Sequence, residues 1–270
     1  TLQRTANRGS VSTGPYEIDN SVKVEADNRE YIRWTNFSTH ASSARKKKFS
    51  MSVWVKRTEI GVQQVIWSTA NNGYLSFQAD DNIKWQQTYS GVQKTLNTNR
   101  LFRDTSAWYH IVLQVDTAQS TEADRTKLFI NGVQETSFSS ATYPDQNDEA
   151  QNLFEQHLVL GEWGGGATGF SGYIADYYHL TEVALVPTDV GEFDSDTGIW
   201  KPKAYSGTIS SPSAFLEFQD SSDLGTATSG LDADTMNNLA AIDQATDTPT
   251  NNYATWNALF HATGANDGYP

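Results

Sequence analysis

Apolar and polar residues alternate along much of the first 190 positions. In residues 49–56 the alternation places Phe49, Met51, Val53 and Val55 on one face and Trp54 on the other. Because side chains of a β-strand point alternately to its two faces, a period of two predicts a half-buried strand. The same reading predicts further strands at residues 64–68, 74–79, 83–89, 108–116, 127–130, 133–138, 157–161, 173–187 and 214–218.

Turn sequences separate these strands. Asn71-Asn72-Gly73 and Asp80-Asp81-Asn82 each lie between two strand patterns, and Asn131-Gly132 is a dipeptide that favours the positive φ angles of a two-residue hairpin turn. No segment shows sustained helical periodicity. Many short strands joined by tight turns predict an all-β, antiparallel two-sheet sandwich or barrel.

The composition of the sequence changes at both ends of the chain. Residues 1–20 are polar and read as an N-terminal arm, residues 21–190 as the sandwich domain, and residues 191–270 as an acidic extension. The extension holds two basic and 11 acidic residues. Its Ser-, Asp-, Thr- and Gly-rich sequence after Gln219 predicts loose structure that becomes ordered by packing on the sandwich or on a partner subunit.

Composition excludes several classes of protein. The formal net charge is −13, which repels nucleic-acid backbones, so no nucleic-acid partner is expected. No run approaches 18 apolar residues, so no membrane insertion is expected. The chain has no cysteine, which excludes disulfides and thiol catalysis. No cofactor is expected, and the five scattered histidines predict no metal site.

Four segments in order resemble the concanavalin A-like, laminin G-type jelly roll. They are residues 49–56, 106–116, 127–132 and 170–180. In that family a Trp/His strand ending in Asp precedes a strand with an Asn/Asp-Gly turn, and a Gly-x-Ile-x-x-Val strand follows. Tyr177 here stands where the family usually has Val. The resemblance implies a two-sheet antiparallel jelly-roll sandwich.

A narrower likeness is to jelly-roll structural proteins of tailed, especially marine, bacteriophages. Residues 16–21, 53–57, 104–112, 193–202 and 247–255 carry it. This resemblance implies a non-enzymatic virion protein of fibre, spike or surface-decoration type, located on the virion surface. Its partners would be other virion subunits and further copies of the same chain. It implies no particular binding residue.

Aromatic residues are the candidate binding chemistry. Residues 85–89 place Trp85, Gln87 and Tyr89 on one strand face, and Trp163 follows Glu162 near a Gly-rich loop. An aromatic ring can stack on the C–H face of a sugar while amides bind its hydroxyls, so these four are candidate residues for host-surface glycan. The alternative is that they pack in the core or between subunits, which would leave a purely structural decoration protein.

Two carboxylate groupings add alternatives. Glu25-Ala-Asp-Asn-Arg-Glu30 matches Glu-x-Asp-x-x-Glu, the signature of one concanavalin A-like glycosidase family, but it lacks the apolar neighbours of a sugar cleft. We expect no catalytic residue, with Glu25 and Glu30 as the glycosidase hypothesis. Asp80-Asp81-Asn82 offers oxygen ligands for calcium, yet the same residues suit a hairpin turn, which is the preferred interpretation.

Overall fold

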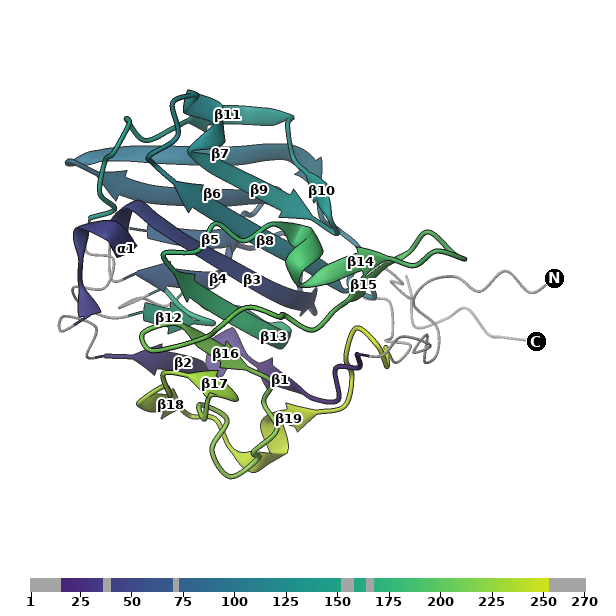
Figure 1. Ribbon diagram of the computed structural model, residues 1–270. Coiled ribbons are helices and arrows are strands. Elements are labelled where there is room, and N and C mark those ends of the chain that lie inside the picture. Colours follow the sequence, from purple (N-terminus) through teal and green to yellow (C-terminus); the bar gives the residue numbers. More distant parts are fainter. Residues whose placement is uncertain (1–15, 36–39, 70–72, 152–157, 164–167, 253–270) are drawn as a thin grey trace, which may run out of the picture.

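The computed structural model describes residues 16–35, 40–69, 73–151, 158–163 and 168–252. Within them the protein is two antiparallel β-sheets packed face to face (Figure 1), which confirms the all-β jelly-roll sandwich. The helical elements that lie wholly within the described residues are α1 (Ser43–Lys47) and the short 3-10 turns η1 (Ala26–Asn28), η3 (Glu122–Asp124), η4 (Pro187–Asp189) and η5 (Ala241–Asp243). No helix among the described residues is long and apolar enough to cross a membrane.

In the described residues the first sheet has nine strands. Its main order is β10 (Val133–Gln134), β9 (Thr126–Ile130), β8 (Tyr109–Asp116), β3 (Lys48–Arg57), β13 (Gly172–Thr181), β1 (Ser21–Val24) and β19 (Gln244–Ala245). In addition, β16 (Ala214–Leu216) pairs with β13, and β17 (Ser229–Gly230) pairs with β16.

The second sheet has eight strands within the same part of the chain. Their order is β11 (Phe138–Thr142), β7 (Val92–Leu101), β6 (Asn82–Tyr89), β5 (Gly73–Phe77), β4 (Gln64–Thr69), β12 (Leu158–Leu160), β2 (Tyr31–Trp34) and β18 (Thr235–Asn237). A separate hairpin, β14 (Gly191–Phe193) with β15 (Trp200–Pro202), follows β13 along the chain.

The core lies between the facing surfaces of the two sheets. Phe49, Met51, Val53 and Val55 of β3 all point into it, as their alternation predicts, and Trp85 enters it from the second sheet. Trp54, between Val53 and Val55, lies in a separate cluster on the outer face of the first sheet. The outer face therefore carries aromatic residues of its own.

The β9–β10 hairpin shows where local sequence decides structure and where it does not. Asn131 has φ 49° and Gly132 has φ 80°, so the predicted two-residue turn is confirmed. The predicted return strand at 133–138 is wrong as a single element. It ends at Gln134, and Phe138 begins β11, which pairs with β7 in the opposite sheet.

The chain after residue 190 takes part in both sheets. In the first sheet, β16 pairs with β13 and β19 pairs with β1, while β18 pairs with β2 in the second. Residues 214–245 therefore lie on the sandwich as short edge strands rather than as loose chain. At the other end Ile18 is buried and its N–H donates to Thr250 Oγ1 at 3.0 Å. Arm residues 1–15 and residues 253–270 lie outside the described residues.

Candidate functional site

The structure places three of the four sequence-predicted glycan-binding residues inside the protein. Trp85, Gln87 and Tyr89 share one face of β6, as expected, but that face is the inner one, and each side chain is 0% exposed. Because a sugar can stack only on a ring it can reach, this corrects the expectation for all three. Their spacing of two showed that they share a face and could not show which face is covered.

Trp163 is partly exposed and packs outside the second sheet. Its ring centroid lies 4.5 Å from that of Tyr74 in β5. The Tyr74 hydroxyl donates to Gln86 Oε1 at 3.4 Å, and Lys84 Nζ lies 5.6 Å from the Tyr74 ring. Trp163 therefore belongs to a different surface from the face of β6 that carries Trp85.

Glu25 and Glu30 are brought together by the η1 turn between β1 and β2. Asn28 Nδ2 donates to Glu25 Oε2 at 3.0 Å and to Glu30 Oε1 at 3.1 Å. Burial raises the pKa of Glu30, while the hydrogen bond from Asn28 opposes the rise. A turn holds the pair instead of the inward-facing strand that a sugar cleft requires. Neither carboxylate lines the pocket described below.

The Asp81 carboxylate forms ion pairs with two arginine side chains. Its Oδ1 accepts from Arg57 Nη1 at 3.2 Å and from the Gly61 backbone at 2.8 Å, and its Oδ2 accepts from Arg103 Nε at 2.9 Å. The Asp81 N–H donates to Gln78 O at 2.9 Å, which confirms the turn interpretation. Among the described residues no group of three or more His, Asp or Glu side chains could hold a metal ion.

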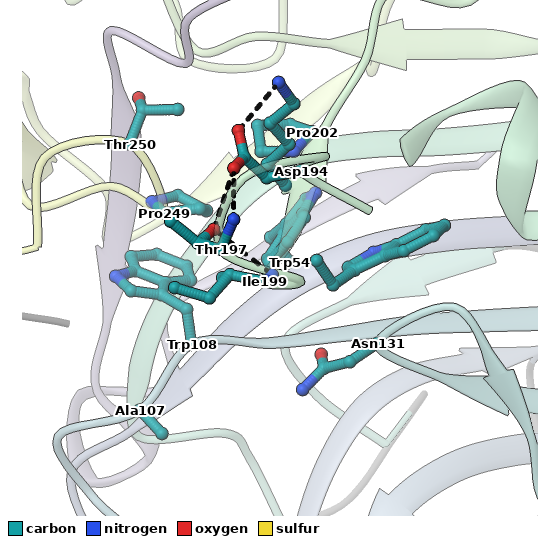
Figure 2. Close-up of a pocket in the computed structure, with 12 residues that line it drawn as sticks. Trp54, Ala107, Trp108, Asn131, Asp194, Thr197, Ile199, Pro202, Pro249 and Thr250 are labelled. Atoms are coloured by element: carbon teal, nitrogen blue, oxygen red, sulfur yellow. Dashed lines mark hydrogen bonds and ion pairs between the residues drawn. The ribbon is translucent and has the colours of Figure 1, made fainter. Parts of the chain in front are cut away.

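A pocket of about 190 Å³ lies on the outer face of the first sheet, under the β14–β15 hairpin. Three indoles line it: Trp54 from β3, Trp108 just before β8, and Trp200 from β15. Figure 2 shows Pro249 and Thr250 on the side opposite Asn131. The remaining lining residues are Ala107, Asp194, Thr197, Ile199, Lys201 and Pro202.

Local sequence accounts for two of these indoles. The alternation of β3 turns Trp54 outward, because Val53 and Val55 point inward. Trp108 precedes Tyr109, which points into the core, so Trp108 points to the outer face. The signal that could have placed them at a site is that each is a large aromatic on the face away from the core.

A buried histidine fixes the third indole. Trp200 Nε1 donates to His110 Nδ1 at 2.9 Å, so Nδ1 carries no proton and Nε2 donates to Ser52 Oγ at 2.8 Å. The His110 ring also stacks on Trp54, with centroids 4.6 Å apart. Burial lowers the pKa of His110 to about 3, which keeps the ring neutral at physiological pH. Trp54, His110 and Trp200 thus form one fixed aromatic wall.

Two glycines allow Trp200 to lie flat against the hairpins. A Cβ atom on Gly132 would fall 2.4 Å from the Trp200 ring, and a Cβ on Gly191 would fall 2.3 Å from it. Any side chain at either position would displace the indole. The Asn131-Gly132 turn, predicted for its backbone geometry, therefore also shapes the pocket.

Two carboxylates and one lysine cluster beside the pocket, and Asp194 and Lys201 of this cluster line it. Hydrogen bonds from the Thr197 hydroxyl and backbone lower the pKa of Asp194 to about 2, so this carboxylate stays ionised. Lys201 Nζ lies 3.3 Å from Glu192 Oε1 and 3.3 Å from Asp194 Oδ2. One cation is therefore shared by two carboxylates, and the local charge remains negative.

The far wall of the pocket is a segment that we call the strap, residues 247–252. Its Pro249 and Thr250 line the pocket. Thr250 Oγ1 donates to Ile18 O at 2.9 Å, so the N-terminal and C-terminal segments hold each other against the sheet. Trp54, Trp108 and Trp200 are 4%, 6% and 8% exposed, so a ligand can reach only the parts of their rings that face this cavity. Those ring surfaces and the polar lining atoms suit binding of a small ring by stacking and hydrogen bonds.

Comparison with known proteins agrees with this fold. The chain belongs to the concanavalin A-like lectin/glucanase superfamily, whose laminin G-type family model matches residues 27–190. The laminin G-type resemblance of the sequence is thereby confirmed. No curated protein matches the chain.

Solved structures with this fold are distant in sequence. The SAP-like pentraxin of Limulus polyphemus is 14% identical, with 63% of this chain and 78% of that chain covered and a TM-score of 0.41. The CBM40 domain of Ruminococcus gnavus IT-sialidase, bound to α2,3-sialyllactose, is 13% identical, with coverages of 63% and 94% and a TM-score of 0.42. Mouse laminin α1 domains LG4-5 are 11% identical, with coverages of 77% and 49% and a TM-score of 0.44, so the match spans about half of that fragment.

Proposed function

We propose that this protein is a non-enzymatic glycan-binding module whose ligand enters the tryptophan-lined pocket. The observation that carries the proposal is the convergence of Trp54, Trp108 and Trp200 on one cavity of a lectin-like fold. Aromatic faces stack on the C–H faces of sugars, and pre-positioned rings lose little conformational entropy on binding. His110 and the two glycines pre-position Trp200 here.

The size and charge of the pocket define the class of glycan. About 190 Å³ is below the roughly 300–1,000 Å³ of sites for drug-sized ligands, so a single sugar ring at a chain end fits best. The lining holds Asp194 and Lys201, and Glu192, which lies outside the lining, also pairs with Lys201, so two carboxylates share one cation beside the pocket. An anionic sugar would be repelled by this excess of negative charge, so the preferred ligand is neutral.

Binding to immobilised neutral and sialylated glycans, with competition by free monosaccharides, tests this proposal. Trp108→Ala should weaken retention about tenfold or more, since the loss of about 1.4 kcal/mol raises Kd tenfold. Ala107→Phe, which fills the pocket and removes no side chain contact, should do the same. Trp163→Ala is the matched control on the other surface and should bind as wild type does.

Two outcomes contradict this assignment. Loss of binding in Trp163→Ala, with Trp108→Ala unaffected, would move the site to the Tyr74–Trp163 surface. Retention of no glycan at all by a folded protein would leave the purely structural alternative.

The glycosidase hypothesis remains the alternative chemistry and has its own test. It requires hydrolysis of a bound glycan and loss of that activity in Glu25→Gln. We propose that neither occurs, because the Glu25–Glu30 pair sits on a turn, apart from the tryptophan-lined pocket. A chromatographic assay for released sugar, run on every glycan that the protein retains, decides between the two.

We further propose that the module serves on the surface of a tailed-phage virion, as a fibre, spike or decoration subunit that contacts other virion subunits and further copies of itself. The support is the sequence resemblance carried by residues 193–202 and 247–255, which include the turn and second strand of the β14–β15 hairpin and the strap. Cryo-electron microscopy of intact particles, with an antibody against this chain, tests the location. Recovery of the chain only as a free monomer outside particles would overturn it.

A further inference from the structure

A lysine, an aspartate and an asparagine meet beneath the strap. Lys56 projects from the outer face of β3, and its side chain is 0% exposed. Its Nζ lies 2.7 Å from Asp247 Oδ2 and 2.7 Å from Asn252 Oδ1. Among the described residues Lys56 is the one lysine that is buried. Lys56 does not line the tryptophan-lined pocket.

The amide of Asn252 presents its carbonyl oxygen to this amine. Its Nδ2 donates to Ser106 O at 3.0 Å, which turns the amide nitrogen away from Lys56 and the carbonyl oxygen toward it. The carbonyl carbon is one C=O bond, about 1.2 Å, from the oxygen that Nζ already contacts. Reacting groups held this close in a fixed orientation gain a large rate advantage over free groups in solution.

Asp247 is held as a base for the same amine. Trp108 Nε1 donates to its Oδ1 at 3.1 Å, which leaves Oδ2 directed at Lys56 Nζ. Ser21 Oγ donates to the Asp247 backbone carbonyl at 2.7 Å. The Tyr173 ring lies 5.8 Å from Nζ and helps to keep water from the group. A nucleophile, a base and an acyl carbon are therefore assembled in a dry site.

We propose that Lys56 and Asn252 join spontaneously in a side-chain amide (isopeptide) bond. Asp247 takes a proton from the Lys56 ammonium, and the free amine attacks Cγ of Asn252. The new N–C bond forms a tetrahedral centre, the attacking nitrogen passes one of its two remaining protons to Nδ2, and the bond from Cγ to Nδ2 then breaks. Nδ2 leaves as ammonia, which takes the first proton from Asp247 and departs as ammonium, so that Asp247 returns to its carboxylate form. No oxidant or other reactant is consumed.

The bond would cross-link the strap covalently to β3 in the central part of the first sheet. It would link residues 196 positions apart in a chain that has no cysteine and so no disulfide. A cross-link over a long loop constrains the unfolded chain strongly. It would also fix the wall of the pocket that Pro249 and Thr250 supply. The inference does not depend on what the pocket binds.

The intact mass of the purified full chain under denaturing conditions tests the bond. We expect a mass lower than that of the sequence by one ammonia. A protease digest should yield one branched peptide that contains both Lys56 and Asn252, identified by tandem mass spectrometry. A mass equal to that of the sequence, with Lys56 and Asn252 in separate linear peptides, would overturn the proposal whatever the variants do.

Variants separate this bond from other losses of ammonia. Lys56→Arg and Asn252→Ala remove one reacting group and should show the full mass. Asp247→Asn keeps both reacting groups, and its cross-linking rate should fall by about 100-fold or more, because general acid–base catalysis contributes about 10²–10⁴-fold. Asn251→Ala is the matched control and should cross-link fully. Cyclisation of an asparagine onto its own backbone would instead persist in Lys56→Arg and give only linear peptides, which also counts against the proposal.

Discussion

Asp176 is a buried carboxyl at the point where β13 bulges. It has φ 45° and is 3% exposed, and its Oδ2 accepts from the Tyr16 hydroxyl at 2.9 Å. Burial raises its pKa to about 8 from an ordinary value of 3.8. In the unfolded chain the group ionises near pH 4, whereas in the folded chain it keeps its proton until about pH 8. Its contribution to stability is therefore complete below about pH 4 and is lost as the pH rises through about 8.

Asp176→Asn should remove the fall in stability that the Asp176 carboxyl causes as the pH rises. From about pH 5 to about pH 7 the free energy of unfolding of the variant should rise relative to wild type by up to about 1.4 kcal/mol per pH unit. Urea denaturation at several pH values measures the difference. Asp194→Asn is the control, because Asp194 already has a pKa of about 2 and stays ionised over this window. A constant difference between wild type and Asp176→Asn would contradict the prediction.

At the scale of single residues the sequence predicts faces better than it predicts exposure. The alternation correctly grouped Trp85 with Tyr89 and separated Trp54 from Val53. Whether a face is covered depends on strands distant in sequence. The first sheet covers Trp85, whereas a hairpin and the strap only partly enclose the space beside Trp54. Three of the candidate glycan-binding residues, Trp85, Gln87 and Tyr89, therefore lie on a covered face, whereas Trp163 is partly exposed.

The β9–β10 hairpin offers a prediction at the scale of an element. Gly132 has φ 80° and would place a Cβ atom 2.4 Å from the Trp200 ring. Gly91 has φ 81° and no atom within 4 Å of such a Cβ. Alanine at either position suffers the same left-handed backbone, at a cost of about 1–2 kcal/mol. Gly132→Ala should lose more stability than Gly91→Ala, because the new Cβ atom at position 132 must displace the Trp200 indole and the one at position 91 meets no atom.

The two variants form a matched pair for measurement. Chemical denaturation gives the loss of stability, and the emission of the native-state tryptophans reports a shift of Trp200 in Gly132→Ala alone. Glycan retention should fall in that variant and remain unchanged in Gly91→Ala. Equal destabilisation of the two, with unchanged emission, would show that the turn and the pocket are independent.

Elements with a clear alternation were predicted closely, and elements without one were missed. β3 was expected at residues 49–56 and spans Lys48–Arg57. β7, with the sequence VQKTLNTNRL, was not predicted, because only Leu96 and Thr98 of its residues are buried. Its existence depends on hydrogen bonding to β6 and β11 on either side. Backbone pairing leaves no hydrophobic pattern in the sequence.

At the scale of the whole molecule, backbone pairing without a hydrophobic pattern also explains why the order of residues 214–245 was not evident from the sequence. The Ser-, Asp- and Gly-rich sequence of this segment correctly indicates little core of its own, yet β16, β18 and β19 are each hydrogen-bonded to a strand of the sandwich. Leu216 and Phe218 enter the main core with Leu224. Composition indicates how much apolar surface a segment can bury by itself. Here the segment is ordered by pairing with strands from another part of the chain, which its composition does not show.

We therefore expect the protein to unfold in one cooperative transition. Strands from residues 214–245 bond to both sheets, so neither sheet can open without losing partners from that segment. In differential scanning calorimetry the calorimetric enthalpy should equal the van't Hoff enthalpy. A chain shortened to residues 1–213 should melt at a lower temperature or aggregate, because it exposes strand edges and part of the core. If the full chain instead melts in two steps, and the shortened chain keeps the upper one unchanged, residues 214–252 are an independent appendage and the cooperative unit ends before them.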